Sequence, residues 1–209
     1  MGRGLRELLS ATLHDIEVTA SIYPNGKFEQ CLENAEQICS GLTKQDFVYI
    51  MCGTNNTCTL PPNSCPRLDL TPIRNIQKWT NVIVSSILYR HDSLSLQNIN
   101  ICYTNEYLEK KCQGLNVNFL QCNAFVKRRH FTRHGLHLNI AGKRVICAGC
   151  TRIEPGTFFF SGKIDKKLRR SHTELSPVYL LSLPDGRFTI IPIHVSTIYI
   201  YNSTYRKGS

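Results

Sequence analysis

The hydrophobic positions along the chain follow two spacings, one typical of helices and one typical of strands. A spacing of three and four residues places Leu5, Leu8, Leu9 and Leu13 on one face and predicts a helix over residues 5–13. Alternation of apolar, partly β-branched residues predicts a strand from Ile16 to Tyr23. The same criteria predict helices over 28–38, 70–79, 98–111 and 139–147, and strands over 47–52, 81–87 and 117–120.

Helices therefore alternate with apolar strands from residue 5 to residue 147. This order predicts βαβ units and a parallel sheet with helices on both faces, which is a three-layer α/β/α fold. Loops that carry function in such sheets follow the carboxyl ends of the strands. The segment 55–67 is rich in Asn, Thr and Pro, and we expect it to be such a loop.

The pattern changes after about residue 149. The apolar runs 178–183 and 188–201, on either side of a Pro-Asp-Gly turn, favour a β-hairpin, although a disordered extension would fit as well. We therefore expect a domain over residues 1–149 and a basic tail over residues 150–209.

The net charge is +10, from 25 basic and 15 acidic residues. Basic runs at 127–130 and 166–170 contribute to it, but no interleaved aromatic residues form a platform for single strands. Such runs are usually solvated, so the charge supports at most weak, non-specific binding of nucleic acid.

The ten cysteines form no compact metal-binding or disulfide framework. Cys147 and Cys150 form the one CxxC pair, and without a second pair we interpret them as two unlinked thiols. The chain has no apolar stretch long enough to span a membrane, and its first residues lack the apolar centre of a signal peptide. We therefore expect a cytoplasmic protein without membrane contact.

Two short motifs suggest chemistry. Gly53-Thr54-Asn55-Asn56 follows the buried run 47–52, and His134-Gly135-Leu136-His137-Leu138-Asn139 precedes a predicted helix. An amide and an imidazole at the ends of buried elements are parts of an acyl-transfer site, although no nucleophile accompanies them.

Each motif also has a plainer interpretation. The asparagines could only form a turn, and His137 could only stabilise the start of the helix. His134 and His137 could share a metal ion, but no third ligand stands nearby in the sequence, so we expect no metal and no cofactor. Ser85 and Ser86 lie at a predicted strand end but lack the turn of a nucleophile elbow.

Over roughly residues 2–147 the chain resembles the SGNH (GDSL-type) hydrolase superfamily, and within it the esterase-like domains of retrotransposon-derived open reading frames. Gly2-Arg3-Gly4-Leu5 is similar to the residues that follow the family's nucleophile serine. Gly53-Thr54-Asn55-Asn56 resembles its Gly-x-Asn-Asp block, and residues 134–139 resemble its Asp-Gly-x-His-x-Asn block.

The resemblance implies a flavodoxin-like sheet and hydrolysis of small esters. Asn55 would donate its side-chain amide, and Gly53 its backbone N–H, to the oxyanion. Asn25 or Gly26 would supply a further backbone donor, and His137 would be the general base.

Three departures from the family lead us to expect an inactive domain. Met1 stands just after the position of the expected serine, which makes the chain resemble a form truncated before the nucleophile. His134 stands where the family has the acid that orients the base, and Asn56 replaces an acidic residue. If the start of the chain is assigned wrongly, the alternative is an active carboxyl-ester hydrolase; a binding module of transposon origin is another.

The family's first strand, which would lie at the centre of the sheet, is also missing. Its two neighbours would be left with unpaired backbone groups, each costing about 1–3 kcal/mol when buried. We therefore expect either that the tail supplies a replacement strand or that the chain folds poorly alone.

Overall fold

A computed structural model describes residues 4–13, 17–58, 60–92, 95–150, 189–191 and 196–202. They form a sheet with the strand order β1-β6-β2-β3-β4, and β5 also pairs with β2. The strands β2, β3 and β4 are parallel to one another. The strands are β1 (Glu17–Tyr23), β2 (Phe47–Met51), β3 (Asn81–Ser85), β4 (Asn118–Leu120), β5 (Thr189–Ile191) and β6 (Ser196–Asn202).

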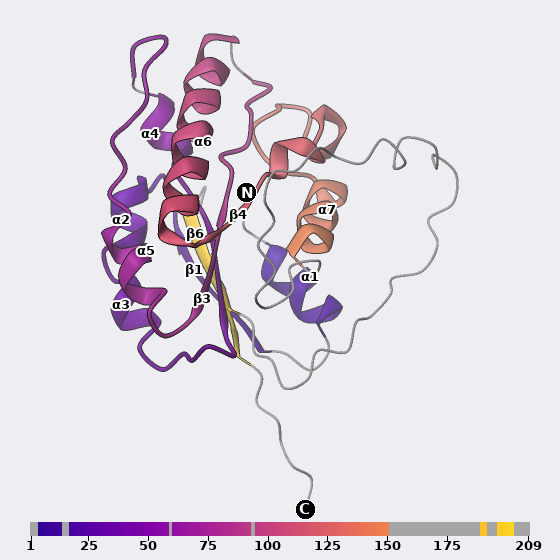
Figure 1. Ribbon diagram of the computed structural model, residues 1–209. Helices are drawn as coiled ribbons and strands as arrows, with labels where there is room; N and C mark the ends of the chain where they lie inside the picture. Colours follow the sequence, from indigo (N-terminus) through magenta and orange to yellow (C-terminus); the bar gives the residue numbers. More distant parts are fainter. Residues whose placement is uncertain are drawn as a thin grey trace, which may run out of the picture.

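Helices cover both faces of the sheet, as Figure 1 shows. One layer contains α2 to α6, and the other contains α1 and α7. The helices are α1 (Leu5–Thr12), α2 (Phe28–Leu32), α3 (Ala35–Ile38), α4 (Thr54–Cys58), α5 (Thr71–Ile76), α6 (Ser95–Leu115) and α7 (Ile140–Cys150). Two turns of 3₁₀-helix lie at Cys122–Ala124 and Arg128–His130. The predicted three-layer α/β/α fold is confirmed.

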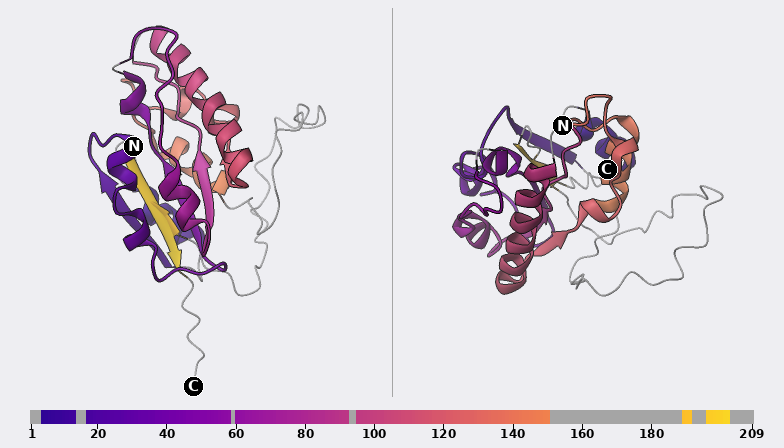
Figure 2. Two further views of the ribbon diagram at one scale, coloured as in Figure 1. Left: turned by 60° about the vertical axis from the view of Figure 1, so that its left-hand side comes forward. Right: turned by 90° about the horizontal axis from the view of Figure 1, so that it is seen from above.

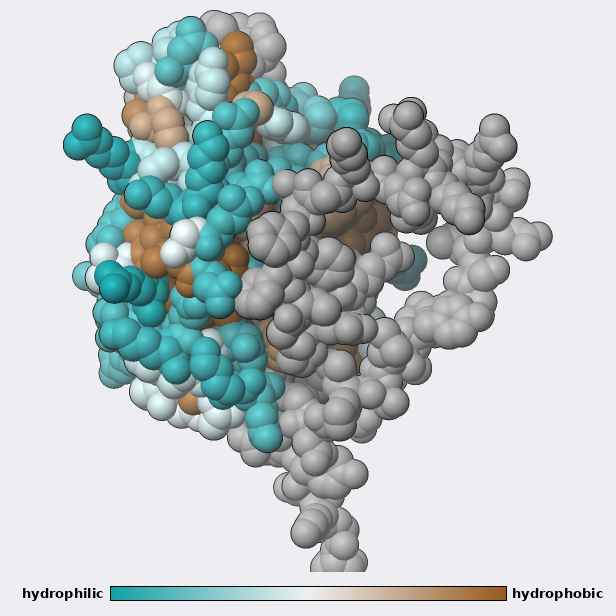
Figure 3. Space-filling view, viewed as in Figure 1, coloured by the Kyte–Doolittle hydropathy of each residue, from teal (hydrophilic) through white to brown (hydrophobic). Residues whose placement is uncertain are grey.

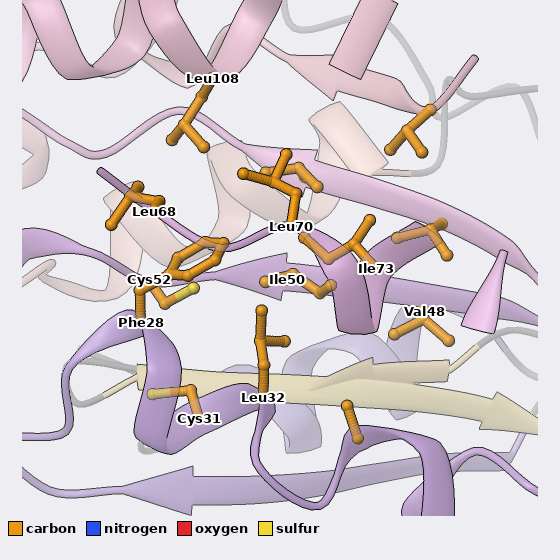
Figure 4. Packing of buried hydrophobic residues seen from close by; sticks show 14 of the residues in the cluster. Phe28, Cys31, Leu32, Val48, Ile50, Cys52, Leu68, Leu70, Ile73 and Leu108 are labelled. Atoms are coloured by element: carbon orange, nitrogen blue, oxygen red, sulfur yellow. The ribbon is translucent and has the colours of Figure 1, made fainter. Parts of the chain in front are cut away.

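The two faces of β2 belong to two separate cores because side chains alternate along a strand. Val48 and Ile50 pack with α2, α3, α5 and α6, and Figure 4 shows Phe28 and Leu32 of α2 beside them. Phe47, Tyr49 and Met51 face the opposite way and pack with α1 and α7. All five residues of β2 are buried, which explains why this strand has no polar position.

The outer surface of the α2–α6 layer is mainly hydrophilic, with apolar residues showing between the helices (Figure 3). Among the described residues, no helix is both long and apolar enough to cross a membrane.

Most predicted elements lie where the hydrophobic pattern put them, with two corrections. The helix predicted over 28–38 is divided into α2 and α3, because Asn34 leaves the helical conformation with φ −107° and ψ 16°. The loop predicted over 55–67 is wrong at its start. The backbone N–H groups of Asn56 and Thr57 donate to the Gly53 oxygen and begin α4.

The strand expected from the tail is confirmed for residues 196–202. β6 lies between β1 and β2 and is antiparallel to both. Figure 2 shows it in yellow within the sheet. Residues 189–191 of the same predicted run, 188–201, form β5 beside β2. The other run of the predicted hairpin, 178–183, lies outside the described residues, as do the basic run 166–170 and His194.

Candidate functional site

The candidate residues follow strands that point in one direction. β1 and β2 are each antiparallel to β6, so β1 runs parallel to β2 and to β3. The loops after β1, β2 and β3 consequently leave the sheet at the same end, the carboxyl end of the strands, where functional loops of parallel sheets lie. Gly26 belongs to the first loop, Gly53 belongs to the second, and Asn55 lies in the helix α4 that begins directly after Gly53.

The loop after β1 is a tight turn. The Gly26 N–H donates to the Tyr23 oxygen over 3.0 Å, and Asn25 takes a left-handed conformation with φ 57°. A Cβ on Gly26 would lie 2.9 Å from the Tyr23 Cβ. The bond to Tyr23 engages the Gly26 N–H, one of the two backbone donors, of Asn25 or Gly26, that the family resemblance would assign to the oxyanion.

The loop after β2 requires glycine. Gly53 has φ +100°, and a Cβ at this position would lie 2.8 Å from Cδ1 of Ile87. The chain turns there into α4, which holds Asn55 half-buried at this end of the sheet. The Asn55 side-chain amide donates to the Gly26 oxygen over 3.1 Å. The amide has two N–H groups, so this bond does not use its full donor capacity.

Asn56 has a structural role. Its Oδ1 accepts a hydrogen bond of 2.8 Å from the Phe28 N–H, and its Nδ2 donates to the Glu29 carboxylate over 3.0 Å. It thereby connects α4 to the first turn of α2. An amide can make both bonds, whereas the aspartate of the family motif could not donate the second.

The loop before α7 packs tightly on the loop after β3. Gly135 has φ +78°, and a Cβ there would lie 2.4 Å from the His91 carbonyl carbon. The His91 N–H donates to the Gly135 oxygen over 2.9 Å. Asn139 caps α7, because its Oδ1 accepts a hydrogen bond from the Gly142 N–H over 2.9 Å. Packing thus accounts for Gly135, and helix capping accounts for Asn139. Neither accounts for His134 or His137.

His137 is exposed on this loop. Partial burial lowers the pKa of its imidazole, and the charges of His134 and Lys143 act in the same direction. The Asp92 carboxylate raises this pKa and so lies within electrostatic reach of the ring. His134 is also exposed, and its charge lowers the pKa of His137, whereas a carboxylate at that position would raise it.

Asp92 was missed in the sequence. It follows β3 by seven residues and is held by Arg90, whose Nη2 lies 2.7 Å from Oδ2 and whose Nε lies 3.0 Å from Oδ1. This two-point contact lowers the pKa of Asp92. The available signal was an acidic residue beyond the carboxyl end of a buried parallel strand.

Arg90 also connects this loop to α4. Its Nη1 donates to the Cys58 sulfur over 2.7 Å, three residues after Asn55 in the same helix. A chain of contacts therefore runs from the helix of Asn55 through Arg90 and Asp92 to the neighbourhood of His137.

Neither Ser85, the last residue of β3, nor Ser86, which follows it, can act as a nucleophile in this arrangement. Ser85 and Ser86 are 1% and 0% exposed. The Ser85 hydroxyl donates to the Ser86 oxygen, and the Ser86 hydroxyl accepts from the Asn123 amide.

The basic cluster 127–130 supports its own loop. Arg128 donates to the backbone oxygens of Thr132 and Arg133, and Lys127 donates to the Asn123 oxygen. These bonds use part of the donor capacity that a phosphate would need.

The ten cysteines, all of which lie within the described ranges, are free thiols. Across the part of the chain that the structure describes, no group of three or more His, Cys, Asp or Glu residues could hold a metal ion.

A comparison with solved structures gives a match to a member of the lipolytic protein G-D-S-L family from Veillonella parvula. The TM-score is 0.51 at 16% sequence identity, and the match covers 73% of this chain and 90% of the other. The chain has the fold of a GDSL-type lipolytic protein. At this identity the likeness concerns the fold alone. No family model and no curated protein matches the sequence.

Proposed function

We propose that this chain is an SGNH-type ester-hydrolase-like domain that binds the acyl group of a small ester but does not turn it over efficiently. The observation that supports the proposal is that Arg90 bonds both to Cys58 in the helix of Asn55 and to Asp92, whose carboxylate acts on His137, in a chain with a GDSL-type fold. In this reading the second N–H of the Asn55 amide and the Gly53 N–H polarise the acyl oxygen.

Asp92 takes the part that the family assigns to the acid of the histidine motif. Its charge favours the protonated imidazole and so would assist His137 in accepting a proton. Its oxygens are held by Arg90, which reduces its strength as a partner for the base.

We infer the absence of efficient turnover from the burial and hydrogen bonding of Ser85 and Ser86 at the end of β3. Both hydroxyls are buried and hydrogen-bonded, so neither supplies the attacking oxygen. With these two hydroxyls engaged, the donors and the base can bind and polarise an ester but cannot form an acyl-enzyme through Ser85 or Ser86.

Binding is tested by titrating the chain with a short-chain carboxylate such as butyrate and following side-chain NMR signals. We expect the Asn55 amide and the His137 ring to shift together in the wild-type chain, and the His137 response to disappear in Asn55→Ala. Asn75→Ala is the matched control, because Asn75 in α5 bonds to Glu36 in the same layer but not to the candidate loops. Independent or absent shifts would contradict a shared acyl site.

Turnover is tested with short-chain nitrophenyl esters and a serine-directed fluorophosphonate. We expect no stoichiometric label and ester hydrolysis that His137→Ala leaves unchanged. Labelling of a single serine, with hydrolysis that His137→Ala abolishes, would instead establish the active carboxyl-ester hydrolase.

A further inference from the structure

The spacing between β1 and β2 differs from that of the other successive parallel strands. β2 is adjacent to β3, and β3 is adjacent to β4, although helices intervene in the chain. β1 and β2 are also joined through helices, yet one strand position separates them. This position, the slot between β1 and β2, is occupied by β6 from the end of the chain.

β6 fills the slot by backbone pairing on both sides. Seven residues pair with β1, from Glu17 with Asn202 to Tyr23 with Ser196. On the other side, Tyr201 pairs with Phe47 and Thr197 pairs with Met51. It is the one described strand that runs against both of its neighbours.

An empty slot would be costly. With β6 in place, all the residues of β2 are at most 5% exposed, and removing β6 would take from β2 the protein partners that β6 supplies to its backbone N–H and C=O groups on that side. Each orphaned group weakens the fold, and for this reason the slot attracts an extended segment that supplies the missing partners.

The side of β2 that faces away from β3 pairs with strands of either direction. β5 pairs in parallel with residues 48–50 of β2, whereas β6 pairs in antiparallel with the residues on either side of them. Backbone pairing recognises an extended conformation more than a particular sequence. Two segments of opposite direction therefore use the same side of β2.

We propose that the slot between β1 and β2 is a binding site for one β-strand, and that residues 196–202 of the same chain are its exchangeable occupant. The ligand class is an extended peptide bound by strand addition. Because β6 is covalently attached, a free peptide must compete with a local concentration on the order of millimolar.

β6, which occupies the slot, pairs with β1 and β2 next to the loops of the candidate site. Ser196, at the start of β6, pairs with Tyr23, three residues before Gly26. Thr197 pairs with Met51, two residues before Gly53. Both loops thus leave the sheet next to the start of β6, and the bond between Asn55 and Gly26 joins them there. The proposal does not depend on ester binding.

The first test uses the full chain with Tyr199→Pro, which removes a ladder hydrogen bond at the centre of β6. Arg206→Pro, four residues beyond β6, is the control. We expect backbone hydrogen exchange in β1 and β2 to rise by about tenfold or more in Tyr199→Pro, with β4 unchanged. Millimolar peptide of residues 194–204 should restore protection. Equal protection in wild type and Tyr199→Pro would overturn the proposal.

A second test does not depend on how the proline variant folds. Peptide 194–204 with a photoreactive phenylalanine in place of Tyr199 is added to the wild-type chain, with a scrambled peptide as control. We expect cross-links in residues 17–23 or 47–51 that the scrambled peptide does not give. The same cross-links with both peptides would overturn strand binding. A dimer with 196–202 cross-linked to residues 17–23 of the other copy would overturn occupancy by the same chain.

Discussion

The side-chain amide of Asn55 donates a hydrogen bond to the backbone oxygen of Gly26, 3.1 Å away. This bond joins the loop after β2 to the loop after β1, although β6 separates the two strands. The neighbouring Asn56 makes a different connection, from α4 to the N–H of Phe28 at the start of α2. Adjacent asparagines therefore have different roles, one beside the candidate oxyanion position and one in the framework.

The two asparagines can be separated by alanine substitution. Asn56→Ala leaves the N–H of the buried Phe28 without its partner, and we expect a loss of about 1–3 kcal/mol in the free energy of unfolding. Asn55→Ala loses one neutral hydrogen bond, to the Gly26 oxygen, for which we expect about 0.5–1.5 kcal/mol. Urea denaturation measures both values. A larger loss for Asn55→Ala would show that this residue, too, is mainly structural.

Asp92→Asn should lower the pKa of His137. The carboxylate raises that pKa, and its removal also leaves the Arg90 charge unbalanced. The ring protons of His137 report the titration by NMR. Asp69→Asn serves as the control, because Asp69 bonds to Thr71 at the start of α5 and does not contribute to the His137 pKa. A His137 titration that is identical in Asp92→Asn would remove Asp92 from the site.

Protonation of His130 should destabilise the fold. Burial and the charges of Arg129 and Lys127 lower its pKa, and its Nδ1 must be unprotonated to accept the Lys127 N–H over 2.9 Å. The unfolded state, with an ordinary pKa of 6.5, therefore binds the proton first as the pH falls.

The free energy of unfolding should consequently be constant above about pH 7 and fall as the pH drops through 6.5 toward the lower folded-state pKa. The pKa values of His91 and His137 are also lowered, so they contribute in the same direction. Denaturant unfolding between pH 7.5 and 5 measures the slope, and His130→Gln should reduce it. Stability that increases on acidification in this range would contradict the assignment.

Gly135→Ala should be strongly destabilising. The positive φ and the approach of the His91 backbone together predict a loss of at least about 2 kcal/mol. Gly114→Ala is a matched control within α6, where a Cβ meets no atom within 4 Å and helix propensity predicts a gain of about 0.5–1 kcal/mol. Thermal unfolding of both variants gives the comparison. Equal effects would mean that the loop moves away from His91.

The thiols should divide into accessible and protected groups. Burial raises the pKa of Cys122 to about 11 and those of Cys39, Cys112 and Cys147 to about 12. At pH 8, iodoacetamide should label the exposed Cys65 in the native protein and these four only after denaturation. Mass spectrometry of the digested chain identifies the labelled sites. Rapid native labelling of Cys39 or Cys112 would show that the α2–α6 layer opens readily.

The sequence predicted the elements whose signal is local. The unbroken apolar run of β2 reflects burial on both faces, and the leucines of α1 repeat at helical spacing because one face packs on the sheet. The division of 28–38 at Asn34 and the helix at 54–58 escaped prediction. The first depends on the backbone conformation of one residue and the second on hydrogen bonds to the Gly53 oxygen, and neither leaves a periodic pattern.

For the candidate site, the sequence indicated the glycine, asparagine and histidine motifs but not how they are connected. Asp92 could not be associated with His137, because 45 residues separate them and only the packing of His91 on Gly135 joins their loops. The bond between the Asn55 amide and the Gly26 oxygen likewise joins residues 29 positions apart, and no local pattern indicates it.

By itself, then, the sequence determined which segments are helices or strands and which polar residues stand at their ends. It could do so because hydrophobic periodicity and turn preferences act between near neighbours in the chain. Only the tertiary structure decided that β6 fills the slot between β1 and β2, that Asn55 meets Gly26, and that Asp92 acts on His137. These contacts join residues distant in sequence, and they exist because the strands share one sheet and their loops leave it at one end.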